Sequence, residues 1–172
     1  RALRDFIKRH VRYGDSCRTI YELQNGRIRP SKELADSLSG LLKGNPEFVL
    51  IDEQKEVFET AMQLAKSVQA RDSEQPKVMI VEGGPGTGKS VVAINLLVRM
   101  IEMGLLAKYV SKNAAPREVY QARLSGSITK SRFRSLFVGS GTFVNTPPND
   151  LDVLIVDEAH RLREQGGLYG NV

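Results

Sequence analysis

The chain has 172 residues, which is the length of about one domain. Its 41% hydrophobic and 26% charged residues are typical of a globular protein, and they exclude the collagen-like, disulfide-rich and fully disordered classes. No apolar run reaches the roughly 18 residues of a membrane-spanning helix, and the opening residues are too charged for a signal peptide. Together with a lone Cys17, these features predict a cytoplasmic protein with no membrane partner.

The basic charge of the chain is concentrated in one segment. The net charge is +5, and residues 108–134 contain seven lysines and arginines against a single acidic residue, Glu118. A stretch of this kind is commonly a solvated face, but it can also bind a polyanion when a neighbouring motif gives it that role. Composition alone leaves both interpretations open.

The first part of the chain predicts short helices. Apolar residues at helical spacing indicate a helix over residues 2–12, a second one that Ser31 can cap, and a third that Asp52 can cap. Between the first two, an Asn25-Gly26 pair is typical of a hairpin turn. The polar residues 71–76 then predict a linker.

After this linker, strands alternate with helices. Apolar segments typical of buried strands cover residues 77–82, 106–111 and 151–157, and shorter strand signals cover 136–138 and 142–144. Helices are predicted over 89–103 and 116–124. This alternation predicts an α/β fold whose parallel sheet is covered by helices on both faces.

A glycine-rich loop follows the first of these strands and matches the complete phosphate-loop pattern. Glycines leave room for phosphate oxygens, and the N–H groups at the helix start form an anion-binding nest. We expect Lys89 to reach the β- and γ-phosphates of ATP, and the Ser90 hydroxyl to ligate Mg²⁺. The predicted ATP-binding residues of the loop are Gly83, Gly84, Pro85, Gly86, Thr87, Gly88, Lys89, Ser90 and Val91.

An Asp157-Glu158 pair supplies the second half of the predicted site. It lies at the carboxyl end of the last strand, where ligands bind in open α/β sheets. Asp157 can hold Mg²⁺ together with Ser90, and Glu158 can accept a proton from an attacking water. Lys89 and Glu158 are therefore the predicted catalytic residues, and the combination favours ATP hydrolysis over binding alone.

Three stretches resemble the bacterial Schlafen group 3-like DNA/RNA helicase domain, which is related to superfamily-one helicases. They read VEGGPGTGKSVVAINLL, YVSKNAAPREVY and VLIVDEAHRLRE, and the last contains Asp157-Glu158-Ala159-His160, which looks like the DEAH form of helicase motif II. The similarity runs from about Gly26 to the end of the chain. It implies a RecA-like fold and a single-stranded DNA or RNA partner.

The resemblance also implies roles for individual residues. Gln54 lies where these helicases place a glutamine that reads adenine, and the alternative is a polar residue in the first turn of a helix. His160 could couple the nucleotide state to the strand-binding surface, or could simply be a packed or exposed histidine.

A second group of residues is implied to bind nucleic acid. Lys112, Asn113 and Arg117 fall where motif Ia grips a single strand, which gives the basic segment a purpose. Thr142 and Phe143 fall near motif Ib, where an aromatic ring could stack on a base. For Phe143, a place in the core is the favoured interpretation.

The chain departs from a complete helicase of this class. The resemblance implies a second RecA-like domain and a further strand in the first domain, and both are expected to be missing from this chain. We therefore expect a helical segment over residues 1–50, a truncated RecA-like domain over 51–172, and the ATP-hydrolysing front half of a helicase or translocase. The alternatives are a signalling or defence ATPase that does not unwind nucleic acid, and an ATP-binding interaction module that does not hydrolyse.

Overall fold

The computed structural model describes residues 2–10, 31–70, 75–112, 118, 120, 122, 130–143, 145–147 and 150–162. Its elements, with η for 3₁₀ helices, are α1 (Ala2–His10), α3 (Lys32–Lys43), η1 (Pro46–Phe48), α4 (Asp52–Gln69), α5 (Lys89–Glu102), β1 (Ala107–Ser111), α7 (Lys130–Leu136), β2 (Phe137–Val138), η2 (Ser140–Phe143), β3 (Val153–Asp157) and η3 (Ala159–Arg161). The predicted Asn25-Gly26 turn lies outside the described residues. So does most of the helix predicted over 116–124, in which Glu118, Tyr120 and Ala122 are helical.

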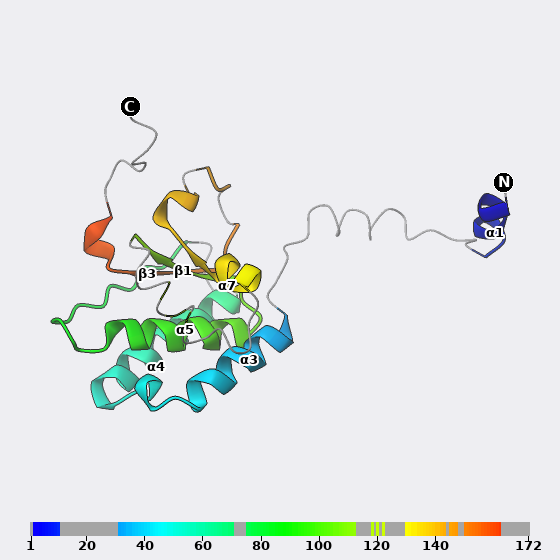
Figure 1. The fold of residues 1–172 in the computed structure, drawn as a ribbon. Helices are drawn as coiled ribbons and strands as arrows, with labels where there is room; N and C mark the ends of the chain where they lie inside the picture. The colour runs from blue at the N-terminus through cyan, green and yellow to red at the C-terminus, as the bar shows by residue number, and fades with distance from the viewer. Residues whose placement is uncertain are drawn as a thin grey trace.

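The strands form a parallel sheet in the order β2-β1-β3 (Figure 1). β1 pairs with β3 along its whole length, from Ala107 opposite Val153 to Ser111 opposite Asp157, and with β2 on its other side. The fold is therefore α/β, with a small three-stranded parallel sheet and helices packed against it, as the alternating pattern predicts.

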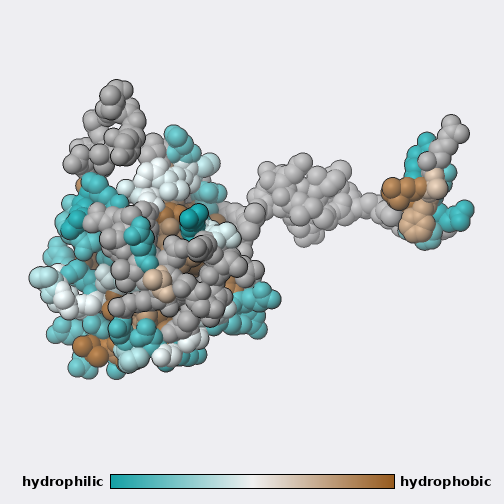
Figure 2. Space-filling view, viewed as in Figure 1, coloured by the Kyte–Doolittle hydropathy of each residue, from teal (hydrophilic) through white to brown (hydrophobic). Residues whose placement is uncertain are grey.

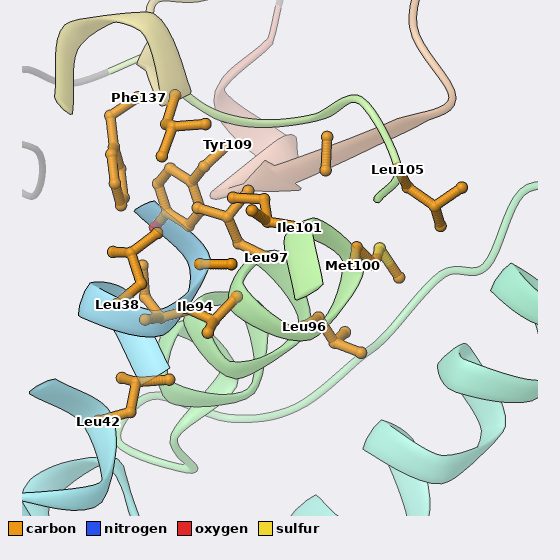
Figure 3. Close-up of a cluster of buried hydrophobic side chains, with 14 of the residues drawn as sticks. Leu38, Leu42, Ile94, Leu96, Leu97, Met100, Ile101, Leu105, Tyr109 and Phe137 are labelled. Atoms are coloured by element: carbon orange, nitrogen blue, oxygen red, sulfur yellow. The ribbon is translucent and has the colours of Figure 1, made fainter. Parts of the chain in front are cut away.

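Helix α5 lies at the centre of the packing. It contacts β1 and β3 on one side, and α3 and α4 pack against it on the other (Figure 1). Its apolar residues recur at a spacing that buries most of its circumference, which suits a helix enclosed between a sheet and other helices. Figure 3 shows Ile94, Leu97 and Ile101 of α5 between Leu38 of α3 and Tyr109 of β1.

The caps of the two helices that cover α5 are formed differently. The Ser31 side chain accepts a hydrogen bond from the Leu34 N–H at 3.3 Å, so the predicted cap of α3 is confirmed. The predicted Asp52 cap is wrong, because Asp52 is already the first residue of α4. Instead, the Ile51 carbonyl accepts the first helical hydrogen bonds, and the Gln54 side chain reaches back to the Ile51 N–H at 3.2 Å.

Two predicted strands are wrong. Residues 77–82 form no strand, and Val78 and Ile80 are 84% and 80% exposed. An apolar run is only compatible with a strand, because a strand also needs the hydrogen-bonding edge of a neighbour, and no described strand pairs with this segment. Of the segment predicted over 142–144, Thr142 and Phe143 instead belong to the 3₁₀ helix η2, and Val144 lies outside the described residues. The sheet is also less covered than predicted, since Leu154 of β3 is 46% exposed.

The N-terminal helices differ in how they pack. Leu38 of α3 belongs to the same hydrophobic cluster as α5, so α3 shares its core with the rest of the fold. In α1, by contrast, Leu3, Phe6 and Ile7 are exposed and form the brown patch that α1 carries in Figure 2. The division of the chain at residue 50 therefore stays a prediction. Among the described residues, no helix is both long and apolar enough to cross a membrane.

Candidate nucleotide site

The carboxyl edge of the parallel sheet gathers most of the predicted site residues. Because β2, β1 and β3 run in the same direction, the residues that follow them emerge along one edge. In sheet order these are η2 with Thr142, then Lys112, then Asp157 and Glu158. The glycine-rich loop reaches the same edge through Ser90, which touches Asp157.

The backbone of the loop has the conformation that its glycines permit. Gly86 and Gly88 have φ of 78° and 82°, in the left-handed region that other residues avoid. Gly88 precedes α5 and provides no side-chain cap, and the first turn of α5 has no acidic residue. No acidic side chain of α5 itself therefore competes for the amide groups at this helix end, which suits a phosphate ligand.

Lys89 is turned back onto the loop. Its Nζ donates to the carbonyl oxygens of Gly83 and Gly84 at 2.6 and 2.7 Å, and the Thr87 hydroxyl donates to the same Gly84 oxygen at 2.9 Å. The ammonium group thus lies over the loop that is predicted to hold phosphate. If Lys89 moved to a phosphate oxygen, its ammonium group would exchange neutral carbonyl acceptors for a charged acceptor, which forms a stronger hydrogen bond.

Ser90 and Asp157, the two predicted metal ligands, are in direct contact. The Ser90 hydroxyl donates to Asp157 Oδ2 at 2.7 Å, although the two residues lie 67 positions apart. One carboxylate and one hydroxyl suit Mg²⁺, which takes oxygen ligands and is commonly held by one or two protein groups plus substrate phosphates. The described residues contain no cluster of three or more acidic, histidine or cysteine side chains for a metal held by protein alone.

A buried tyrosine completes the surroundings of Asp157. Tyr109 of β1 is fully buried, and its hydroxyl donates to the same Oδ2 atom. Burial first, and then the hydrogen bond and charge of Asp157, raise the pKa of Tyr109 far above its usual range. Burial and the charge of Asp157 likewise raise the pKa of Tyr120. Both phenols therefore stay protonated, and Tyr109 is a permanent donor to the carboxylate.

Sequence reasoning missed Tyr109. The signal was a tyrosine inside an otherwise apolar strand, because a buried phenol needs a partner for its hydroxyl.

Another polar group at this edge is Ser111, which pairs in register with Asp157 and is fully buried. Its Oγ has no hydrogen-bond partner among the described residues, and the usual partner of such a group is a ligand or an ordered water.

Glu158 follows in a strained conformation. It is the one described residue other than glycine with positive φ, at 56°. Its carboxylate Oε2 accepts from Arg161 Nε at 3.1 Å and lies 3.3 Å from His160 Nε2. The Glu158 N–H donates to Asp157 Oδ1 at 3.0 Å. The predicted base is thus fixed by its own turn, and His160 is an exposed neighbour of Glu158.

Gln54 lies against the loop. Its Nε2 donates to the Thr87 carbonyl at 3.0 Å while its Oε1 accepts from the Ile51 N–H. A Cβ built on Gly88 would approach this Nε2 to 2.3 Å. Both ends of the amide therefore bind backbone groups, and the adenine-reading role stays a prediction.

The residues predicted to bind nucleic acid are only partly described. Asn113 and Arg117 lie outside the described residues. Lys112 Nζ donates to the Arg161 carbonyl at 3.0 Å, and Lys108 Nζ donates to the Ser135 carbonyl. Thr142 is exposed, and Phe143 is half-buried outside the main hydrophobic cluster. Part of the basic charge is thus used in contacts within the protein.

A comparison of the sequence with protein families shows to which family the chain belongs. A model of the Schlafen group 3, DNA/RNA helicase domain matches residues 76–172, which is more than half of the chain. The chain belongs to this family. The match includes the glycine-rich loop and the Asp157-Glu158 pair, and it supports a helicase-like domain that acts on nucleic acid. It begins after Gln54, so the resemblance predicted from about Gly26 is confirmed only from residue 76 onward, and for the residues before that it stays a prediction. No curated protein and no solved structure matches the chain.

Proposed function

We propose that this Schlafen group 3 domain is the ATP-binding and ATP-hydrolysing part, with a RecA-like fold, of a nucleic-acid helicase or translocase. The observation that carries the proposal is the contact between Ser90 and Asp157 at the carboxyl edge of a parallel sheet. It joins the two halves of a nucleotide site that the sequence separates by 67 positions.

The chain's own residues suggest how the reaction would proceed. The loop amides and Lys89 would bind the β- and γ-phosphates of ATP, with Lys89 leaving the Gly83 and Gly84 carbonyls. Glu158 would orient a water in line with the γ-phosphorus and accept its proton. Ser90 and Asp157 would hold Mg²⁺, which when bound neutralises charge on the phosphate oxygens. Because Arg161 and His160 lie beside the Glu158 carboxylate, Glu158 would have to be released from this pair to act.

The nucleic-acid partner is proposed to run along the same edge. Lys112 follows β1, the strand beside the Asp157 strand, and η2 follows β2, the next strand of the sheet. A single strand crossing these positions would lie next to the nucleotide, so that hydrolysis could move it. The competing proposal is a switch ATPase that binds no nucleic acid, and the internal contacts of Lys108 and Lys112 favour it, since they lower the charge available to phosphates.

Removal of the Lys89 amine tests the nucleotide site. Calorimetric titration with ATP and Mg²⁺ should show binding by the wild-type chain and at least a tenfold weaker affinity for Lys89→Ala, because each charge-assisted bond to phosphate contributes about 1.5–3 kcal/mol. Lys66→Ala, which removes an exposed lysine of α4, is the matched control and should bind like wild type. Equal affinities for all three proteins would mean that the loop does not hold phosphate.

A further inference from the structure

We propose that Tyr109 is a positioning residue of the magnesium site, whose hydroxyl holds the Asp157 carboxylate in the orientation that ion binding requires. The inference rests on the proposed function, because the orientation of Asp157 matters only if ATP binds together with Mg²⁺. It adds to that function a residue outside both the glycine-rich loop and the Asp157-Glu158 pair.

Three donors fix the two oxygens of Asp157. Oδ2 accepts from the Ser90 hydroxyl at 2.7 Å and from the Tyr109 hydroxyl, and Oδ1 accepts from the Glu158 N–H at 3.0 Å. The Ser90 oxygen is itself a predicted ligand, so its bond to Asp157 can change when an ion binds. The Tyr109 hydroxyl comes from the buried interior and is not itself a predicted ligand, so its bond to Asp157 can persist when an ion binds. Partners behind a ligating carboxylate fix its direction in this way.

Tyr109 is itself held by the core. Ser111 of β1 pairs with Asp157, and Tyr109 lies two residues before Ser111. Because side chains two residues apart in a strand point to the same face, Tyr109 lies on the face of the sheet that carries Ser111 and Asp157. The ring packs against Phe137 with centroids 5.2 Å apart and meets the edge of Tyr120 at 6.0 Å. Figure 3 shows Tyr109 beside Phe137 at the upper end of the hydrophobic cluster.

The hydroxyl distinguishes Tyr109 from a packing residue. Phe133 and Phe137 in the same aromatic group are buried without a polar atom, and their rings stack with centroids 4.1 Å apart. A phenylalanine at position 109 would fill the same space. Burying a hydroxyl has a desolvation cost unless the hydroxyl is hydrogen-bonded. The Tyr109 hydroxyl avoids this cost by donating to the Asp157 carboxylate, which a phenylalanine could not do.

The test separates the hydroxyl from the ring. Binding of a fluorescent ATP analogue is measured in EDTA and across a Mg²⁺ series for wild type, Tyr109→Phe and Phe133→Leu. The last is a control that disturbs the same aromatic group through Phe137 but keeps the Tyr109 hydroxyl. We expect Tyr109→Phe to bind the analogue in EDTA as wild type does, and to need roughly tenfold more Mg²⁺ for half of the magnesium-dependent gain. Phe133→Leu should keep the wild-type response.

The outcomes distinguish the two proposals. If wild type does not bind the nucleotide, the proposed function fails. If wild type binds it and Tyr109→Phe responds to Mg²⁺ within twofold of wild type, or if Phe133→Leu shifts the response as much as Tyr109→Phe does, only the role of the Tyr109 hydroxyl is overturned. In an Asp157→Asn background, Tyr109→Phe should have little further effect, since both changes act on one carboxylate.

A spectroscopic measurement covers the case in which Tyr109→Phe does not fold. The five tyrosines of the wild-type chain are replaced by 3-fluorotyrosine, and the Tyr109 fluorine signal is assigned by elimination from single Tyr→Phe changes at the other four. Adding Mg²⁺ to the ATP complex should move the Tyr109 signal beyond its position with ATP in EDTA. Identical positions under the two conditions would overturn the inference.

Discussion

Gly88→Ala probes the contact between α4 and the glycine-rich loop. Gly88 has φ of 82°, and a Cβ there would come within 2.3 Å of Gln54 Nε2. The left-handed conformation costs an alanine about 1–2 kcal/mol. The flexible Gln54 side chain can move aside, but it then loses its bond to the Thr87 carbonyl, which contributes about 1 kcal/mol. We expect Gly88→Ala to lower the free energy of unfolding by about 2–3 kcal/mol.

Two other glycines separate these contributions. Gly104 has φ of 77°, but a Cβ at this position would have no described atom within 4 Å. Gly104→Ala should therefore lower the free energy of unfolding only by the cost of the left-handed conformation, about 1–2 kcal/mol. Gly40 lies inside α3 in open space without positive φ, so Gly40→Ala should stabilise the protein by about 0.5–1 kcal/mol. Urea denaturation followed by circular dichroism gives all three values.

The comparison can refute the reasoning directly. If Gly88→Ala costs no more than Gly104→Ala, the Gln54 contact contributes nothing to stability. In a Gln54→Ala background the clash is absent, so Gly88→Ala should there cost the same as Gly104→Ala. An unchanged cost in that background would place the strain elsewhere in the loop.

Two further predictions concern the chemistry and the partner. In a protein that carries the complete helicase unit, Glu158→Gln should keep ATP affinity within about twofold and lower steady-state turnover at least ~10²-fold, because a general base contributes that much. Glu59→Gln, which changes an exposed side chain of α4, is the control. A loss of ATP affinity as large as the loss of turnover would assign Glu158 to binding. Replacing Lys112 and Arg117 together by alanine should flatten the salt dependence of single-strand affinity by about one to one and a half log–log units, since each neutralised phosphate contributes about 0.7. Fluorescence anisotropy across a salt series measures this slope, and the double variant Lys43→Ala, Lys66→Ala is the control. An unchanged slope would mean that the basic stretch is only a solvated face, and it would favour the switch ATPase.

The parts of the fold that were predictable are those set by local pattern. The Ser31 cap, the helix after Gly88, its end before Gly104 and the strand leading to Asp157 all follow from residues that act on their immediate neighbours. Residues 77–82 have equally good strand composition, yet all of them except the half-buried Met79 are exposed. A strand there would need the hydrogen-bonding edge of a neighbouring strand, and a short apolar run carries no information about such an edge.

The site shows the same division between motif and tertiary contact. The pattern of Gly83–Ser90 and the Asp157-Glu158 pair identifies the phosphate and metal groups because phosphate chemistry restricts residue types at fixed spacing. The partners that orient these groups obey no such spacing. Tyr109 reaches Asp157 across 48 positions, and Gln54 reaches Thr87 across 33, each through a contact that exists only once the sheet and helices have packed. A motif therefore predicts which atoms meet the substrate, and the packed structure is needed to find the residues that hold those atoms in place.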